Sequence, residues 1–580
     1  MTVGRYLVVL GRSEGNARDR LLIGARHALP RLNIVMDGAY CTVLADALLP
    51  RARFGEGRGC ILGRLHGPDE AAFLTTGGRP SSAADWQAVT RDNWGDYLLI
   101  EESRGAPVVD IVRSAMGGLS CYHVSHAGLF LLSDAPRLLE RLGINLAIDA
   151  DAVLRQMLSN VSRGPATCLA GLGELERGYR LSWREGVVET EPYWNPWSYA
   201  GRAGQMKDLA DAPVLVRKRV IEATRRTAKG YGHILLGLSG GLDSSILAAS
   251  LAHTGAAFSC FTLVTHDGPG DERYHARLVA RHLGKHLHEI EERPGDIDIA
   301  RSAAAHLPRP VARCFAQSDD AIQMALASRL GVDALMSGGG GDNIFYYVHS
   351  VRPLVDRLLV EGLGKGAWRT ARDLALLTDS PLGAIIGRAL GRCLSRSHDY
   401  LWTLDTRYLR AEACTIRREA LGHGWMKAPA GELPGKAQHI AWILGVLNHV
   451  EGFAREQVYP TLWPLLAQPL VETCLSVPSW AWLEGGHNRA LARRAFAGLL
   501  PEPILARRSK GSPDSFAIGL FEQRKAQIER HLCDGWLAAQ GLVDVDAIAR
   551  GCRQGPVHKD GTVWSLLRLV DAESWARSWA

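Results

Sequence analysis

The sequence predicts an α/β protein with a β-rich amino-terminal part and a carboxyl-terminal part built on a doubly wound parallel sheet with many helices. Up to about residue 200, short apolar runs alternate with turn residues, which is typical of a β-rich layered structure. Further along, apolar strands alternate with helical patterns over short connections, as in a parallel sheet covered by helices. Two glycine-rich loops, each holding one aspartate, directly follow predicted strands of this second part.

Length and composition indicate a globular protein of more than one domain. The 580 residues exceed the roughly 100–200 residues of a usual domain. We expect two domains, the β-rich part at 1–205 and the part built on the parallel sheet at 206–580. The net charge of +6 is spread without a Lys/Arg block, so no nucleic-acid partner is indicated. The eleven cysteines include no CxxC pair, and neither a signal peptide nor a membrane span is evident, so we expect a cytoplasmic protein without membrane contact.

The clearest strands of the first part are 7–10, 97–100, 108–112 and 129–132. The stretch 194–205 is rich in residues that break regular structure, and we expect it to be a linker.

In the second part, a helix with apolar residues at Val216, Val220 and Ala223 leads into a strand that begins at Ile234. Further strands are predicted at 258–264, 286–290 and 332–336, with helices at 271–283 and 319–330. Residues 354–500 are mostly helical by pattern and rich in tryptophan, and we expect most of these rings to be packed in the core.

The stretch 234–245 predicts a strand, a tight loop and the start of a helix. Glycines let a backbone fold closely around an anion, while serine hydroxyls, loop amides and the following helix amino terminus all favour phosphate. An acid beside phosphates implies a cation between them, and Mg²⁺ suits one or two carboxylates plus phosphate oxygens. The candidate nucleotide-binding residues of this stretch are Gly237, Leu238, Ser239, Gly240, Gly241, Asp243, Ser244 and Ser245, with Asp243 as a metal ligand.

A second glycine-rich loop, 337–345, follows the strand predicted at 332–336. Loops at the carboxyl ends of parallel strands share one crevice, so we expect Asp342 to face the same nucleotide as Asp243 and to complete the metal site.

The heptapeptide SGGLDSS at 239–245 resembles the pyrophosphate loop of the N-type ATP pyrophosphatases, which include asparagine synthetases, β-lactam synthetases and lasso-peptide cyclases. The second loop is similar to the Ser-Gly-x-Gly-x-Asp motif of that family. The resemblance implies ATP and Mg²⁺ as cofactors, with Ser337 and Gly338 near the ribose and α-phosphate and with the backbone of Gly237 and Leu263 near adenine. It also implies a catalytic role for Lys510, which follows a basic helix as the lysine of the synthetases does, beside Asp243 and Asp342.

The first part resembles the glutaminase domain of the asparagine synthetases, an αββα sandwich of the amino-terminal nucleophile (Ntn) type. The likeness rests on the order of several short motifs, among them Trp94–Tyr97, Arg113 and Glu176–Tyr179. The family's nucleophile is a cysteine after the initiator methionine, whereas Thr2 stands here, and the triplet that holds glutamine is absent. We therefore expect a domain that has lost ammonia production. Three other cysteines are nucleophiles by residue type, although buried structural thiols are the commoner case: Cys41, Cys60 and Cys121.

Gly339 follows Ser337 and Gly338, where asparagine synthetases place a glutamate and β-lactam synthetases a tyrosine. Lasso-peptide cyclases carry this glycine-rich form of the loop. The resemblance therefore implies an enzyme that adenylates an Asp or Glu side chain of a leader-free core peptide and closes a macrolactam ring with the peptide's own α-amine. Its expected partners are the precursor peptide and the leader-binding and leader-peptidase proteins of the pathway.

Three alternatives remain open at this point. The first is an ammonia-dependent asparagine synthetase or a β-lactam-type cyclase, which Gly339 disfavours. The second is a tRNA-modifying relative, which would require an RNA-binding module. The third is a non-catalytic scaffold, which predicts loss of the nucleotide-binding residues. The histidine-rich stretch from His282 to Glu289 is interpreted as structural, because the family has a His-Glu pair there without a transition metal.

Overall fold

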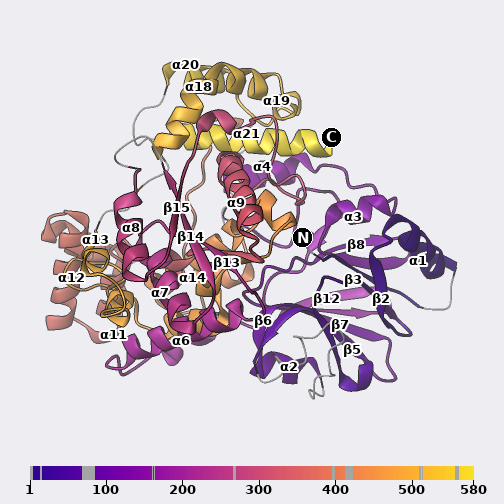
Figure 1. Ribbon diagram of the computed structural model, residues 1–580, viewed down its shortest axis with the longest axis horizontal. Coiled ribbons are helices and arrows are strands. Elements are labelled where there is room, and N and C mark those ends of the chain that lie inside the picture. Colours follow the sequence, from indigo (N-terminus) through magenta and orange to yellow (C-terminus); the bar gives the residue numbers. More distant parts are fainter. Residues whose placement is uncertain are drawn as a thin grey trace.

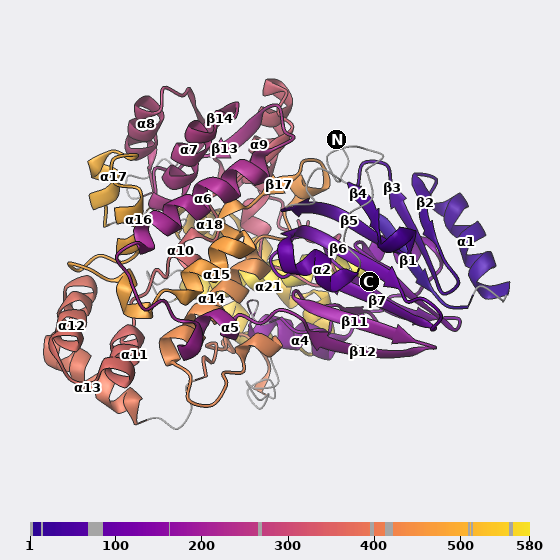
Figure 2. The same cartoon turned by 90° about the horizontal axis from the view of Figure 1, so that it is seen from below.

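The computed structural model describes residues 4–12, 16–67, 85–159, 161, 163–264, 270–394, 399–411, 422–508, 511, 514–555 and 561–580. The amino-terminal part forms a β-sandwich beside a larger helical part that surrounds a parallel sheet (Figures 1 and 2). The predicted α/β class is therefore confirmed.

Two six-stranded antiparallel sheets make up the sandwich. Apolar side chains between the sheets form one core, which includes Val8, Leu98 and Ile111. The first sheet has the order β10 (Gly173–Glu174), β8 (Tyr122–His126), β9 (Leu129–Ser133), β1 (Tyr6–Leu10), β3 (Cys41–Asp46), β2 (Leu32–Asp37). The second has the order β12 (Val187–Pro192), β11 (Tyr179–Arg184), β7 (Val108–Arg113), β6 (Trp94–Glu102), β5 (Gly59–His66), β4 (Arg51–Phe54).

Helices cover both outer faces of the sandwich, which gives the expected αββα arrangement. Helices α1 (Asn16–Ala28), α3 (Pro136–Arg141) and α4 (Ala150–Leu158) share a core with Leu7 and Val9 of β1. Helix α2 (Trp86–Asp92) packs Val89 against Leu99 on the other sheet. Strand β1 is buried along its whole length because both of its faces are covered.

The second part is built on a five-stranded parallel sheet with the order β15 (Leu287–Glu291), β14 (Phe258–Val264), β13 (Ile234–Gly237), β16 (Ala334–Met336), β17 (Thr461–Leu462). Helices α7 (Leu242–Thr254) and α8 (Arg273–His282) lie on one side of the strands and α9 (Gln317–Leu330) on the other (Figures 1 and 2). The strand order reverses between β13 and β16, which is where ligands of doubly wound sheets bind.

The predicted strands and helices of this sheet are present, with ends shifted by no more than two residues. Strand β17 is a finding of the structure, because its two residues follow a long helical insertion and show no strand pattern of their own. The other helices are α6 (Ala212–Ala228), α10 (Gly341–Ile344), α11 (Arg352–Glu361), α12 (Lys365–Thr378), α13 (Leu382–Cys393), α14 (Pro434–His449), α15 (Gln468–Ser476), α16 (Ala490–Ala495), α17 (Glu502–Ala506), α18 (Asp514–Cys533), α19 (Trp536–Ala539), α20 (Val545–Gln554) and α21 (Thr562–Trp579).

The two parts are joined by a shared apolar core and by a network of ion pairs. Side chains of α18 and α21, such as Leu520 and Leu566, belong to the same apolar cluster as β1. The stretch 194–205, expected to be a linker, is a packed connection instead: it holds α5 (Trp197–Ala200), and the rings of Trp194 and Trp197 are buried. Aromatic burial outweighed the turn-forming residues around it.

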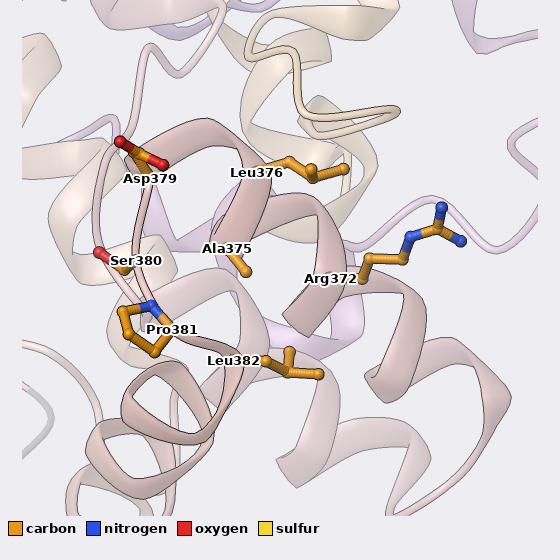
Figure 3. A pocket seen from close by; sticks show the side chains of 7 residues that line it. All are labelled: Arg372, Ala375, Leu376, Asp379, Ser380, Pro381 and Leu382. Carbon is orange, nitrogen blue, oxygen red and sulfur yellow. The ribbon is translucent and has the colours of Figure 1, made fainter.

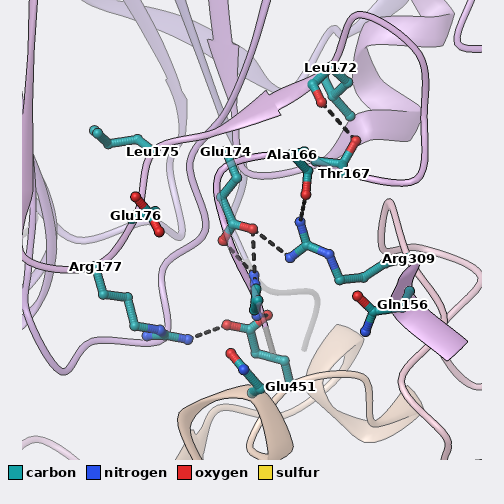
Figure 4. A network of polar contacts seen from close by, with 12 residues as sticks. Gln156, Ala166, Thr167, Leu172, Glu174, Leu175, Glu176, Arg177, Arg309 and Glu451 are labelled. Atoms are coloured by element: carbon teal, nitrogen blue, oxygen red, sulfur yellow. Dashed lines mark hydrogen bonds and ion pairs between the residues drawn. The ribbon is translucent and has the colours of Figure 1, made fainter. Parts of the chain in front are cut away.

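A buried ion network also joins the two parts (Figure 4). Glu174 lies 2.7 Å from Arg113, 2.5 Å from Arg309 and within ion-pair distance of Arg163. Burial opposes ionisation of Glu174, but the guanidiniums of Arg163, Arg309 and Arg113 outweigh it and hold the pKa of Glu174 well below its usual value. A second carboxylate, Glu451 of the larger part, pairs with Arg163 at 2.7 Å.

Candidate functional site

A cavity of about 610 Å³ lies at the carboxyl ends of the central parallel strands. Both glycine-rich loops line it. Most of the site residues predicted from the sequence line this cavity: Gly237, Leu238, Ser239, Gly241, Asp243, Ser244, Leu263, Ser337, Gly338 and Asp342. Gly240 and Ser245 do not line it; Ser245 is fully buried and its hydroxyl donates to the carbonyl of Gly241 at 2.7 Å. Sequence spacing could not separate these two from their neighbours.

The first loop presents hydroxyls and amides at the amino terminus of α7. The hydroxyls of Ser239 and Ser244 are 3.2 Å apart, and the amide of Gly241 donates to Ser239 Oγ at 3.3 Å. Polar groups of this kind, placed at the positive end of a 13-residue helix, favour an anion.

The second loop is pressed against the first, and glycines make this possible. A Cβ added to Gly338 would come within 2.8 Å of the Ser244 amide nitrogen, and one added to Gly341 within 2.3 Å of the Asp243 carboxyl carbon. Larger residues at either position would separate the loops, so the glycines bring the two aspartates to one place.

Arg489 lies between those two aspartates. Its Nη1 is 3.1 Å from Asp243 Oδ1 and also bonds to Asp342 Oδ1. Arg489 itself has a φ of 53°, a left-handed backbone that is uncommon for a side-chain-bearing residue. In the sequence, only its place in a basic segment distinguishes this position.

The aspartates fit a magnesium ion. The guanidinium of Arg489 shows that both carboxylates can hold one cation between them, and carboxylate oxygens are the ligands that Mg²⁺ prefers. Among the described residues, this site included, no group of three or more His, Cys, Asp or Glu side chains is arranged to hold a metal ion, so the protein offers two carboxylates here and the other ligands would come from phosphate oxygens and water. In the stretch 282–289 predicted to be structural, Glu289 pairs with Arg277 at 2.6 Å.

The predicted catalytic Lys510 lies outside the described residues. The chain on either side of it is held at the cavity by Glu272, whose Oε1 accepts from Arg507 at 2.8 Å and from the Gly511 amide at 3.1 Å. Arg507 also donates to the carbonyl of Gly240 in the first loop. Arg507 and Gly511, described residues on either side of Lys510, both line the cavity.

The far wall of the cavity is aromatic and basic, and sequence reasoning did not find it. Phe453 and Trp463 stack with ring centroids 6.3 Å apart, and the guanidinium of Arg455 lies 3.8 Å from the Phe453 ring. Arg455 pairs with Asp319 and Asp320. These residues come from a helical insertion and from the start of α9, so no local pattern links them.

Trp463 occupies the space above Gly339. A Cβ at Gly339 would lie 2.5 Å from the Trp463 ring, too close for any side chain to fit without moving the ring. The space beside Gly339 is thus filled by a tryptophan that follows another strand, β17.

The three cysteines considered as nucleophiles in the amino-terminal part lie in the core of the β-sandwich. Thr2 lies outside the described residues. Cys41, Cys60 and Cys121 are buried between the sheets, and burial raises the pKa of Cys60 and Cys121 to about 12 and that of Cys41 well above its usual value. Neutral buried thiols are poor nucleophiles, which agrees with the structural interpretation.

A second cavity, of about 480 Å³, lies between the end of α12 and the start of α13 (Figure 3). It is lined by residues such as Arg372, Leu376 and Leu382, and neither glycine-rich loop reaches it. In the described part of the chain, no helix has the length and apolar character needed to cross a bilayer.

Two solved structures are among those similar to the chain: the "allosteric regulatory enzyme of purine biosynthesis" (9% identity, 50% of this chain and 80% of that one, TM-score 0.20) and glutamine phosphoribosylpyrophosphate amidotransferase from B. subtilis (10% identity, 57% and 90%, TM-score 0.21). Scores this low carry no functional inference. No curated protein matches the chain.

A family model described as asparagine synthase matches residues 215–392 and 460–577, which together are about half of the chain. The matched segments contain both glycine-rich loops, Arg489 and the segment around Lys510. The chain therefore belongs to the asparagine synthase family, whose members are ATP-using carbon–nitrogen ligases.

Proposed function

We propose that the protein is an AMP-forming amide ligase of the lasso-peptide cyclase type, which joins an Asp or Glu side chain of a leader-free peptide to that peptide's own amino terminus. The observation that carries the proposal is the pairing of Gly339 with Trp463. It removes the side chain that small-molecule ligases of the family place beside their substrate, and it gives the cavity an aromatic wall with Phe453. Aromatic faces suit a peptide better than ammonia or free aspartate.

The chemistry follows from the two loops. A carboxylate resists amines because oxide is a poor leaving group. A carboxylate oxygen attacks the α-phosphorus of ATP, and the bond to pyrophosphate breaks. The amine nitrogen then attacks the acyl carbon, the bond to AMP breaks, and the amine gives up a proton.

In this scheme the serines of the first loop and the amide of Gly241 bind the pyrophosphate. Asp243 and Asp342 would hold Mg²⁺, which supplies charge neutralisation for the departing pyrophosphate. Lys510 would stabilise negative charge on the α-phosphate. Arg489 would withdraw from the aspartates when the metal binds, since one position cannot hold both cations.

The buried network around Glu174 supports a scaffolding role for the amino-terminal part. It fills the contact between the two parts with fixed, paired charges such as Arg309 and Arg163. We therefore propose that the amine comes from the peptide and not from glutamine, and that a leader peptidase and a leader-binding protein deliver that peptide.

The test is incubation of the protein with Mg-ATP and a leader-free candidate peptide, with AMP measured and the product weighed by mass spectrometry. We expect AMP release and a peptide lighter by one water, both abolished in Asp243→Ala. AMP and asparagine formed from aspartate and ammonium, with no peptide, would refute the proposal in favour of an asparagine synthetase.

A further inference from the structure

Four of the five arginines that line the cavity have their guanidiniums bound within the described protein, three by carboxylates and one by backbone carbonyls. Arg455 pairs with Asp319 and Asp320, Arg489 with the two loop aspartates, and Arg507 with Glu272. Arg493 donates to three backbone carbonyls.

Arg313 is the exception. It lines the cavity, its side chain is buried, and it forms no ion pair with any described carboxylate. Its Nε has no hydrogen-bond partner in the described part of the chain. The carboxyls of Glu456, Asp571 and Asp320 act on it only from a distance. Burial lowers the pKa of Arg313 to about 10, so the guanidinium still carries its charge at neutral pH.

Two contacts hold this guanidinium in one orientation. Its Nη2 donates to His449 Nδ1 at 3.0 Å, because a guanidinium cannot accept, and its Cζ lies 4.2 Å from the centre of the Phe453 ring. Burial and the neighbouring Arg313 lower the pKa of His449 to about 4, so the imidazole is neutral and can accept this bond.

The residue before Arg313 has a strained backbone conformation that neighbouring groups stabilise. Ala312 has a φ of 58°, a left-handed conformation that L-residues other than Asn and Asp seldom adopt. Buried Asp571 of α21 fixes it by accepting from the amides of Val311 and Ala312 at 3.1 and 2.7 Å. Strained backbone that other groups hold in place is common where a side chain must be aimed at a ligand.

A buried cation without a carboxylate partner is unfavourable unless a ligand supplies the missing charge. We propose that Arg313 binds the side-chain carboxylate of the substrate peptide, with Phe453 and Trp463 contacting the apolar part of the same residue. A guanidinium fork matches the two oxygens of a carboxylate. The inference deepens the proposed function, because it assigns the acid-bearing residue of the peptide to one wall of the cavity.

The test uses two probes that differ only in the carboxylate: N-acetyl-aspartate N-methylamide and N-acetyl-asparagine N-methylamide. Their dissociation constants are measured by calorimetry for the full-length wild type in the presence of a non-hydrolysable ATP analogue. We expect the aspartate probe to bind about 10- to 100-fold more tightly than the asparagine probe, as for a hydrogen bond to a charged group.

Arg313→Met should bind both probes equally weakly, and Arg313→Lys should keep part of the preference. Affinity for the ATP analogue reports whether each variant is folded and should not change. Arg329→Met is the matched control, because this exposed arginine lies near the end of α9 away from the cavity wall, and it should behave as wild type.

Equal binding of the two probes by the wild type, or a preference that survives in Arg313→Met, would overturn the inference. Failure of the proposed function shows differently, as absence of peptide-dependent AMP release in the wild type whatever the probes do.

Discussion

Between the two parts of the molecule, Arg113, Arg163 and Arg309 all pair with the one carboxylate of Glu174, whereas in the cavity Arg313 forms no ion pair with a carboxylate of the described residues. All four guanidiniums are buried. The charges of the first three are compensated by carboxylates of the chain, and these ion pairs hold the two parts together. The charge of Arg313 is left for the carboxylate of a bound ligand. Burial alone therefore does not tell a structural arginine from a functional one, but the set of partners does.

The largest effect is expected at the interface. Glu174→Gln removes the negative charge that three buried guanidiniums share. We therefore expect the free energy of unfolding, measured by urea denaturation, to fall by about 3–5 kcal/mol. The control is Glu191→Gln on β12, whose carboxylate is well exposed and pairs with Arg180; it should cost less than about 1 kcal/mol. Equal effects in the two variants would contradict the structural assignment.

In the cavity, Asp243→Asn should act on chemistry more than on stability. We expect AMP formation to fall at least about 100-fold, because one of the two carboxylates proposed to hold Mg²⁺ is lost, while the free energy of unfolding in urea changes far less than in Glu174→Gln. Asp405, which pairs with Arg568 away from the loops, provides the comparison: Asp405→Asn should leave AMP formation near the wild-type rate. Normal activity in Asp243→Asn would sink the metal site.

The contact of Gly339 with Trp463 predicts a smaller change. Gly339→Ala places a Cβ within 2.5 Å of the ring, and we expect a loss of about 1–3 kcal/mol from overpacking, measured by thermal unfolding. Trp463→Leu should relieve this overpacking. The loss of stability in the double variant should therefore be smaller than the sum of the losses in the two single variants.

Gly383→Ala, in helix α13 with open space around it, serves as the control and should stabilise slightly. Additive effects of the Gly339 and Trp463 substitutions would show that the two side chains do not meet.

The smallest effect concerns Glu292, a cavity carboxyl whose described partner is the Ser318 hydroxyl. Burial raises its pKa to about 7, the opposite of Glu174. The folded state then holds a proton that the unfolded chain releases near pH 4.5, so this group's contribution to stability falls as pH rises from about 4.5 to 7.

Glu292→Gln should flatten that part of the stability curve by about 1 kcal/mol, as followed by urea unfolding at pH 5 and pH 8. An unchanged slope would mean that the carboxyl is ionised in the folded protein.

The sequence predicted the strand, loop and helix at 234–245 well, because a short apolar strand, two glycines and a helix lie next to one another in the chain. It also predicted that Asp243 and Asp342 would share one crevice, since loops at the carboxyl ends of parallel strands lie at the same edge of the sheet. It missed Arg489, Trp463 and Arg313 as site residues, because each reaches the cavity from a segment whose local pattern says only that it is helical or basic.

What the sequence determined by itself is therefore the class of the fold, the order of its central strands and helices, and the two loops that suit a nucleotide. Apolar periodicity and the conformational preferences of turn residues act over a few neighbouring residues, and these features of the fold depend only on such local patterns. Tertiary structure alone decided that Asp571 of α21 holds the backbone before Arg313, that Trp463 fills the space beside Gly339, and that the expected linker carries a short helix with two buried tryptophans. These depend on which distant segments share a surface, and burial and charge pairing settle that only when the whole chain has folded.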